Sequence, residues 1–288
     1  MTPTPATSDP ATSDPVPPIV SAGWLTDHRA GTVICEVGSS MTGGDPEEAH
    51  AKRHLPGARY VSLDTVLATP PSVAGGRHPL PTADDFARDL GALGIGDDVT
   101  VVAYDRRAGG GFAGRLVWML RIIGQRAALL DGGLGAWDGP SESGPVAVEP
   151  VDRTVRPWPS GALADADAVA QHIRAGGIVI DSRDPARYAG AVEPIDAVAG
   201  HIPGAINLVY TDNLDAELRF REPAELSERF AVTATDVDPI VYCGSGVTAC
   251  QNALVMEHLG LGRPRLFVGS WSAWSADPDR AVATGPTP

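Results

Sequence analysis

The chain has 288 residues, of which 43% are hydrophobic and 20% are charged, and its formal net charge is -14. This composition is typical of a globular protein rather than a disordered one, and the length suggests two domains, although one large domain is also compatible with it. A strongly acidic chain repels phosphate backbones and anionic lipid headgroups, so nucleic acids and membranes are excluded as principal partners.

The chain opens with a segment of low complexity. The sequence ATSDP occurs at residues 6–10 and again at 11–15, and the opening segment consists almost entirely of Thr, Pro, Ser, Asp and Ala. Such a segment buries too little apolar surface to offset its ordering entropy, so we expect a disordered tail over residues 1–18. It has no basic region followed by an apolar run, and no later stretch reaches the ~20 apolar residues of a membrane span, so we expect neither a signal peptide nor an anchor.

After the tail, short apolar runs alternate with amphipathic stretches. Strands are expected at TVICEV (32–37), VTVVAY (99–104), GIVIDS (177–182) and PIVYC (239–243), and helices within 82–94, 109–124 and 244–260. Thr82 has the residue type of an N-cap, with Asp85 at the third helical position. Nearly continuous apolar strands are typical of a parallel sheet covered on both faces. We therefore predict an α/β fold with its ligand at the carboxyl ends of the strands.

Four motifs recur in the same order in the two halves of the chain. They are VICE and IVID (33–36 and 178–181), HLPGA and HIPGA (54–58 and 201–205), VVAYD and PIVYC (101–105 and 239–243), and GGLGAW and GSWSAW (132–137 and 269–274). Four matches in register indicate a duplicated domain. A stretch rich in Pro, Gly and Ser separates the copies. We expect the first domain over 19–140, a linker over 141–160 and the second domain over 161–288.

Three cysteines are too few for a disulfide framework and lack the spacing of a zinc site, which favours a reduced, cytoplasmic setting without a bound metal. Cys243 ends an apolar run, and Gly-Ser-Gly at 244–246 leads into a helix. Such a turn directs backbone N–H groups at one point, so we expect a thiolate with a pKa below the ordinary ~8.5. Cys35 and Cys250 are expected to be packing residues, with a redox partnership between Cys250 and Cys243 as the alternative.

The stretch CGSGVTA at 243–249 resembles the active-site loop of the rhodanese superfamily, in particular of its two-domain 3-mercaptopyruvate and thiosulfate sulfurtransferases. The sequences DSRDPARYAG (181–190), GHIPGA (200–205), GGLGAW and GSWSAW match as well, and the resemblance covers about residues 19–275. It implies two rhodanese-like domains, no cofactor, and a double displacement in which Cys243 carries sulfur as a persulfide to cyanide or to a thiol such as thioredoxin. Asp105 stands where the second copy has Cys243, so the resemblance implies a catalytically silent first domain.

Two sulfur donors stay open. Relatives that prefer thiosulfate carry basic side chains after the cysteine, so the neutral loop favours 3-mercaptopyruvate, with thiosulfate as the alternative. Mercaptopyruvate also requires proton transfer. In relatives that use it, a loop serine forms a relay with a histidine and an aspartate of the first domain, and the matching positions are Ser245, His78 and Asp64.

The resemblance further implies a site for the donor. Arg187 would bind its carboxylate, since a guanidinium can hold two oxygens at once. The remaining loop residues, Gly244, Gly246, Val247 and Thr248, would surround the reacting sulfur. A second arginine of many relatives falls near Ile195, where this sequence has none, which weakens the assignment of the donor.

Other residues receive structural predictions. His54 and His201 each precede Pro-Gly and are expected to lie in hydrogen-bonded turns. Trp271 and Trp274 are expected to be packing residues. Arg183 is expected to pair with a neighbouring acid.

Two rival functions use the same fold. A phosphatase of this fold would need an arginine at position 249, because its positive charge stabilises phosphoryl transfer. This chain has Ala249 there and so lacks that charge. A non-catalytic binding module typically lacks the cysteine that this chain retains.

Overall fold

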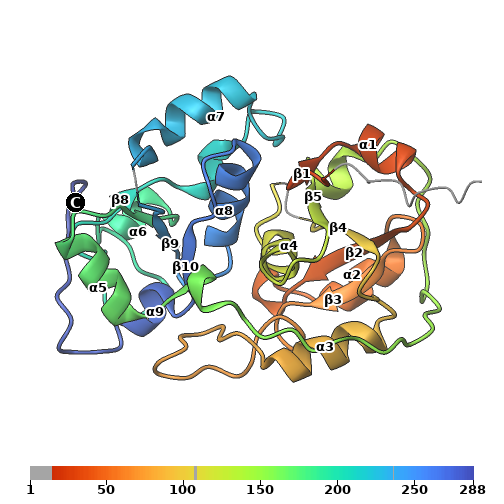
Figure 1. Ribbon diagram of the computed structural model, residues 1–288, viewed down its shortest axis with the longest axis horizontal. Helices are drawn as coiled ribbons and strands as arrows, with labels where there is room; N and C mark the ends of the chain where they lie inside the picture. The colour runs from red at the N-terminus through yellow and green to blue at the C-terminus, as the bar shows by residue number, and fades with distance from the viewer. Residues whose placement is uncertain (1–14, 107–108, 236) are drawn as a thin grey trace, which may run out of the picture.

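The computed structural model describes residues 15–106, 109–235 and 237–288, and contains two five-stranded parallel sheets side by side (Figure 1). The strands are β1 (Ile19–Val20), β2 (Thr32–Gly38), β3 (Arg59–Ser62), β4 (Thr100–Tyr104), β5 (Ala127–Leu130), β6 (Leu163–Ala164), β7 (Val179–Asp181), β8 (Ile206–Asn207), β9 (Ile240–Tyr242) and β10 (Arg265–Phe267). Residues 1–14 of the predicted tail lie outside the described part of the chain.

The two sheets have the same topology. Their strand orders are β1-β5-β4-β2-β3 and β6-β10-β9-β7-β8, with every pairing parallel. The orders become identical when the second set of five strands is laid over the first, strand by strand. The predicted α/β fold and the predicted duplication are therefore both confirmed.

Helices flank both sheets (Figure 1). They are α1 (Ala22–Asp27), α2 (Pro46–Lys52), α3 (Ala83–Ala92), α4 (Ala113–Ile122), α5 (Ala166–Arg174), α6 (Pro185–Tyr188), α7 (Pro223–Phe230), α8 (Ala249–His258) and α9 (Ser270–Trp274), with short 3-10 helices at Ser40–Thr42, Gly133–Ala136, Ser160–Ala162, Tyr210–Asn213 and Ala231–Thr233. As predicted, Thr82 caps α3, and its hydroxyl accepts the N–H of Asp85 at 3.1 Å. In the described residues, no helix combines the length and apolarity needed to cross a bilayer.

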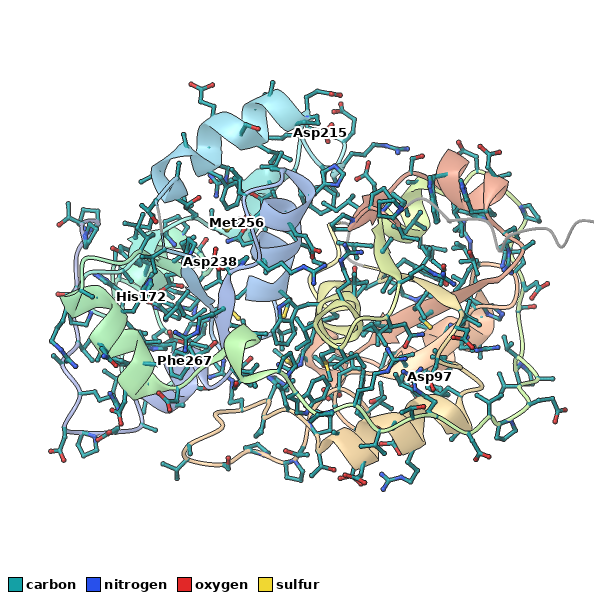
Figure 2. The ribbon with its side chains drawn as sticks, in the orientation of Figure 1. Asp97, His172, Asp215, Asp238, Met256 and Phe267 are labelled. Atoms are coloured by element: carbon teal, nitrogen blue, oxygen red, sulfur yellow. The ribbon has the colours of Figure 1, made fainter. Side chains whose placement is uncertain are left out.

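The apolar core joins the two domains. Side chains along β9 and β10 alternate between the two faces of the second sheet. Met256 of α8 belongs to a cluster that includes residues of both domains, whereas Phe267 of β10 belongs to a cluster of second-domain residues (Figure 2). Helices α4 and α8 pack together between the sheets, with Gly114 of α4 facing the backbone of Gln251 in α8. The interface is thus part of the protein core.

The two turns HLPG (54–57) and HIPG (201–204) are equivalent in structure. The Nδ1 of His54 lies 2.9 Å from the carbonyl oxygen of His50, and the Nδ1 of His201 lies 2.8 Å from that of Tyr188. The backbone of each turn also forms an antiparallel bridge to a later segment, at Glu142 and at Ala283. These contacts give both histidines the structural turn role that the sequence predicts.

Candidate active site

Cys243 follows β9 directly, and residues 244–248 form a tight loop before α8 begins at Ala249. The residue is only 2% exposed, its N–H donates to the hydroxyl of Ser270 at 3.2 Å, and its carbonyl accepts the N–H of Trp271 at 3.0 Å. Gly246 has a φ of +71°, and a Cβ there would lie 2.5 Å from the carbonyl oxygen of Val268. Only glycine fits this bend.

The loop surrounds the Cys243 sulfur with hydrogen-bond donors. Burial raises the pKa of the thiol, but four donors together lower that pKa below its ordinary value. They are the hydroxyl of Thr248 and the backbone N–H groups of Ser245, Ala249 and Val247. Because these donors are part of the loop and the start of α8, they stabilise an anion at this point before any substrate arrives.

The other two cysteines have the opposite electrostatics. Burial in the middle of β2 raises the pKa of Cys35 to about 12, and burial also raises the pKa of Cys250. The Cys250 thiol donates to the carbonyl of Gly246 at 3.4 Å, and all three cysteines are free. Cys250 lies in the first turn of α8. Both thiols are protonated packing groups, as predicted.

Ser245 faces the first domain. Its hydroxyl lies 2.8 Å from Nδ1 of His78, which comes from the loop between β3 and α3. Burial lowers the pKa of His78 to about 4, with further lowering by the positive charges of Arg115 and Arg77 and an opposing effect of Asp64. The imidazole is therefore neutral at neutral pH and can take a proton from the hydroxyl.

Asp64 lies in the same region but is not hydrogen-bonded to His78 in the described structure. Its carboxylate accepts the hydroxyl of Ser39 and the backbone N–H of Ser40, each at 2.8 Å. Burial raises its pKa, but these hydrogen bonds outweigh that effect and lower the pKa below its ordinary value. Of the three residues expected to form a relay, Ser245 and His78 are in contact. Asp64 affects His78 through its negative charge, which raises the pKa of the imidazole.

Arg77 and Arg187 lie beside Gly244 of the Cys243 loop, Arg183 lies against Trp271, and each of the three arginines is paired with acids. Arg183 binds Asp181 at 2.6 Å, as the sequence predicts, and lies 4.6 Å from the centre of the Trp271 ring. Arg187 binds Glu193 at 2.7 Å. The third, Arg77, comes from the first domain and was not identified from the sequence. Its position directly before His78 is the signal that could have found it.

Both tryptophans after β10 are buried, and their indole N–H groups donate to backbone carbonyls. Trp271 reaches Val198 at 3.0 Å and Trp274 reaches Ala281 at 2.9 Å. The predicted packing role is what the structure shows.

The sequence model described as rhodanese-like domain matches residues 44–139 and 165–277. The chain belongs to the rhodanese family. It is 42% identical over 245 residues to a protein of Pseudomonas aeruginosa named "Probable 3-mercaptopyruvate sulfurtransferase", covering 82% of this chain and 86% of that protein. The thiosulfate sulfurtransferase of the same bacterium is 34% identical, with 81% and 86% covered. The structure of 3-mercaptopyruvate sulfurtransferase from Leishmania major matches with a TM-score of 0.78 and 31% identity, covering 92% of this chain and 76% of that one. These relatives place the protein among the two-domain sulfurtransferases of the family.

Arg115 connects the first rhodanese domain to the loop of the second. It lies on α4 and is fully buried, and within the described part of the chain its acceptors are all backbone carbonyls: Leu67 at 3.1 Å, Gly246 at 3.0 Å, His78 at 2.8 Å and Pro79 at 3.4 Å. One guanidinium therefore fixes both the loop around Cys243 and the segment that carries His78. The sequence signal was an arginine within an otherwise apolar helix, at GRLVWML.

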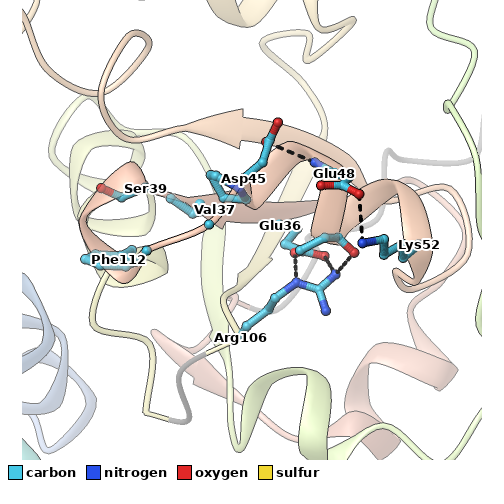
Figure 3. A pocket seen from close by; sticks show the side chains of 13 residues that line it. Glu36, Val37, Ser39, Asp45, Glu48, Lys52, Arg106 and Phe112 are labelled. Atoms are coloured by element: carbon cyan, nitrogen blue, oxygen red, sulfur yellow. Dashed lines mark hydrogen bonds and ion pairs between the residues drawn. The ribbon is translucent and has the colours of Figure 1, made fainter.

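The first rhodanese domain has a hollow at the equivalent place. Its volume is about 380 Å³, and the described residues that line it include neither cysteine nor histidine. Arg106 lies within it and pairs with the strand-end acid Glu36 at 2.7 Å (Figure 3). Asp105, which stands in the position of Cys243, accepts the N–H groups of Phe112 at 2.7 Å and Ala113 at 3.1 Å. The Asp105 carboxylate therefore accepts hydrogen bonds from the backbone at the start of α4.

Proposed function

We propose that the protein is a 3-mercaptopyruvate sulfurtransferase with Cys243 as its nucleophile. One observation carries the choice of donor: the hydrogen bond between Ser245 and His78, formed across the domain interface beside a stabilised thiolate. Mercaptopyruvate has a thiol proton to lose and a carbon that must gain one, so its cleavage requires a group that moves protons. A neutral histidine bonded to a loop hydroxyl supplies that group.

The first half-reaction leaves sulfur on the enzyme. The Cys243 thiolate attacks the donor's sulfur, an S–S bond forms, and the electron pair of the breaking C–S bond leaves on the donor's carbon as the enolate of pyruvate. The donor's thiol proton passes through Ser245 and His78 to that carbon, which gives pyruvate and a Cys243 persulfide anion. Atoms and charge balance without any cofactor or external oxidant.

The second half-reaction returns the enzyme to its starting state. A thiolate or cyanide attacks the outer sulfur of the persulfide, the S–S bond breaks, and the Cys243 thiolate leaves with the electron pair. The loop donors around Cys243 stabilise that leaving group as they stabilise the attacking thiolate. A thioredoxin-type acceptor and a cytoplasmic location stay predictions from the sequence.

Thiosulfate is the second candidate donor, and the 34% identical thiosulfate sulfurtransferase favours it. Its cleavage needs no proton transfer, so it makes no use of the Ser245–His78 pair. We expect the specificity constant for mercaptopyruvate to exceed that for thiosulfate, because the Ser245–His78 pair assists only the mercaptopyruvate reaction. Steady-state kinetics with each donor, and mass spectrometry for one added sulfur atom on Cys243, measure this. A preference for thiosulfate would replace the assignment, and no added sulfur from either donor would support a binding module instead.

A further inference from the structure

The two helices at the domain interface, α4 and α8, make the same contact in both directions (Figure 1). The third residue of α4 is Arg115, and its Nη1 donates to the carbonyl of Gly246 in the loop after β9 at 3.0 Å. The third residue of α8 is Gln251, and its Nε2 donates to the carbonyl of Gly109 in the loop after β4 at 2.5 Å. Both glycines have a positive φ, +71° and +87°. Each domain therefore holds the loop of the other through one side chain.

The two contacts differ in charge. Both side chains are fully buried, but Gln251 is a neutral amide and Arg115 carries a positive charge. Taking a charge out of water costs far more free energy than taking an amide out of water, unless an anion compensates the charge. Gln251 shows that an amide is sufficient to hold a loop carbonyl across this interface. The charge of Arg115 therefore has a purpose beyond the hydrogen bond.

No carboxylate of the described residues lies within ion-pair distance of the Arg115 guanidinium, whose acceptors there are all backbone carbonyls. The groups whose negative charge acts on it are the two cysteines of the neighbouring loop and helix, Cys250 and Cys243. Burial raises the pKa of the Cys250 thiol, so this group is protonated at neutral pH. In the described part of the chain, the anion that faces Arg115 is therefore the Cys243 thiolate.

Two other arginines lie near the loop, but an acid compensates both of them. Arg77 and Arg187 come close to Gly244, and Asp196 forms an ion pair with each. The negative charge of that carboxylate reduces the effect of the two guanidinium groups on the sulfur. The effect of Arg115 is not reduced in this way.

We propose that Arg115 is a positioning residue for sulfur transfer: it holds the loop around Cys243 and the segment of His78 on one guanidinium, and the anion on the Cys243 sulfur compensates its charge. The inference rests on the proposed function, because it explains how the nucleophile of that reaction stays anionic. In both half-reactions this sulfur site carries a negative charge, first as the thiolate and then as the persulfide. The first domain thus contributes a charge to the reaction, although Arg115 is too deeply buried to reach a substrate.

The test separates the charge of Arg115 from its hydrogen bonds. Arg115→Gln removes the charge but leaves an amide, the same group with which Gln251 holds the other loop. We expect the pKa of Cys243 to rise by about one unit, the lower end of the range for a nearby charge, so alkylation by iodoacetamide should be about tenfold slower below both pKa values. The pKa of His78, about 4 in wild type, should also rise, which histidine NMR signals recorded against pH measure.

Two shifts in the same direction identify the loss of a charge. A cation disfavours protonation of every neighbouring group, so its removal raises the pKa of the thiol and that of the imidazole together. Water that enters a loosened interface would raise the pKa of His78 but lower that of Cys243, because hydration favours both charged forms. An unchanged or lowered Cys243 pKa in folded Arg115→Gln protein would overturn the inference.

Arg115→Lys and Arg121→Gln are the controls. Lysine keeps the charge but cannot reach all four carbonyls, so Arg115→Lys should restore most of the Cys243 pKa even where it lowers stability. Arg121, near the other end of α4, also crosses the interface and binds Glu257 of α8 at 2.9 Å. Arg121→Gln should lower stability without moving either pKa. A Cys243 pKa as high in Arg115→Lys as in Arg115→Gln, or an equal rise in Arg121→Gln, would also overturn the inference.

The reaction itself provides a further measurement. Cleavage of thiosulfate needs no proton transfer, so the acidic limb of kcat/KM for this donor reports the Cys243 thiolate. In Arg115→Gln that limb should move to higher pH by the same amount as the alkylation profile, and a limb that stays in place would contradict the inference.

If Arg115→Gln does not fold, Arg115→Met replaces it, because an apolar side chain of similar length removes the buried charge without adding a buried polar group. The same two rises in pKa are expected. Alkylation and NMR need no sulfur donor, so these variants can overturn the inference while the proposed function stands. Wild-type protein that takes up no sulfur from either donor would overturn the proposed function, and with it the role of Arg115 in that reaction, so the two failures are distinguishable.

Discussion

The loops after β4 and β9 are two versions of one structure, and they differ in the anion at their centre. Each follows the middle strand of its sheet and leads into the helix at the domain interface. In the first domain the Asp105 carboxylate accepts N–H groups at the start of α4, and in the second the Cys243 sulfur accepts those at the start of α8. The fold thus supplies a site for an anion in both domains, and the residue in it decides whether that anion is structural or reactive.

The strand-end acids show a second difference. Glu36 of the first domain pairs with Arg106, which follows the Asp105 position, whereas Asp181 of the second pairs with Arg183 from its own strand end. In the first domain an arginine therefore occupies the hollow beside the loop (Figure 3). The first domain therefore has an aspartate where the second has Cys243, and an arginine beside the same loop.

The largest difference is expected between substitutions of the two anionic residues, Cys243 and Asp105. Cys243→Ser should abolish sulfur transfer from either donor, because no thiolate remains to form the persulfide. Asp105→Ala should keep the turnover of folded protein within about twofold, but lower the free energy of unfolding by about 1–3 kcal/mol, since two buried N–H groups lose their acceptor. Steady-state kinetics and urea denaturation measure the two quantities. A large loss of turnover in a folded Asp105→Ala protein would show that the first domain is not silent.

The next effect concerns what the first domain contributes to the reaction. Ser245→Ala or His78→Ala should lower kcat/KM for mercaptopyruvate about 100-fold and leave thiosulfate turnover nearly unchanged, because only mercaptopyruvate needs the proton transfer. Asp64→Asn should have a smaller effect, since Asp64 has no hydrogen bond to His78 in the described structure. Equal losses with both donors would show that Ser245 and His78 support the loop rather than the chemistry.

The same pair makes a prediction about pH. Folding lowers the pKa of His78 from 6.5 to about 4, so the unfolded chain binds a proton below pH 6.5 that the folded protein does not bind. His78 therefore makes stability fall as the pH drops from 6.5 towards 4, and His78→Gln should weaken that dependence. Urea denaturation at several pH values measures it. Identical pH dependence in the two proteins would show that His78 titrates normally in the folded state.

The sequence predicts the repeated parts of this molecule well and the contacts between the repeats poorly. Apolar strands, the Thr82 cap and the turns at His54 and His201 depend on local patterns, and all are present as predicted. Arg77 and Arg115 depend on how two distant segments meet, which no periodicity encodes. The family resemblance pairs Ser245 with His78, and the two side chains do lie in contact, but it could not show that Asp64 binds Ser39 and Ser40.

The smallest effect tests the anion site one donor at a time. Thr248→Val removes the hydroxyl that lowers the Cys243 pKa most, but keeps the shape and the backbone N–H groups of the loop. We expect that pKa to rise by about one unit, because a hydrogen bond to a charged group contributes roughly 1.5–3 kcal/mol and one unit corresponds to about 1.4 kcal/mol. The rate of alkylation by iodoacetamide reports the thiolate, so the variant should react up to about tenfold more slowly below both pKa values and equally fast above them. Thr26→Val, an exposed change on α1, is the control. Coincident pH profiles would mean that the backbone N–H groups alone hold the sulfur as an anion.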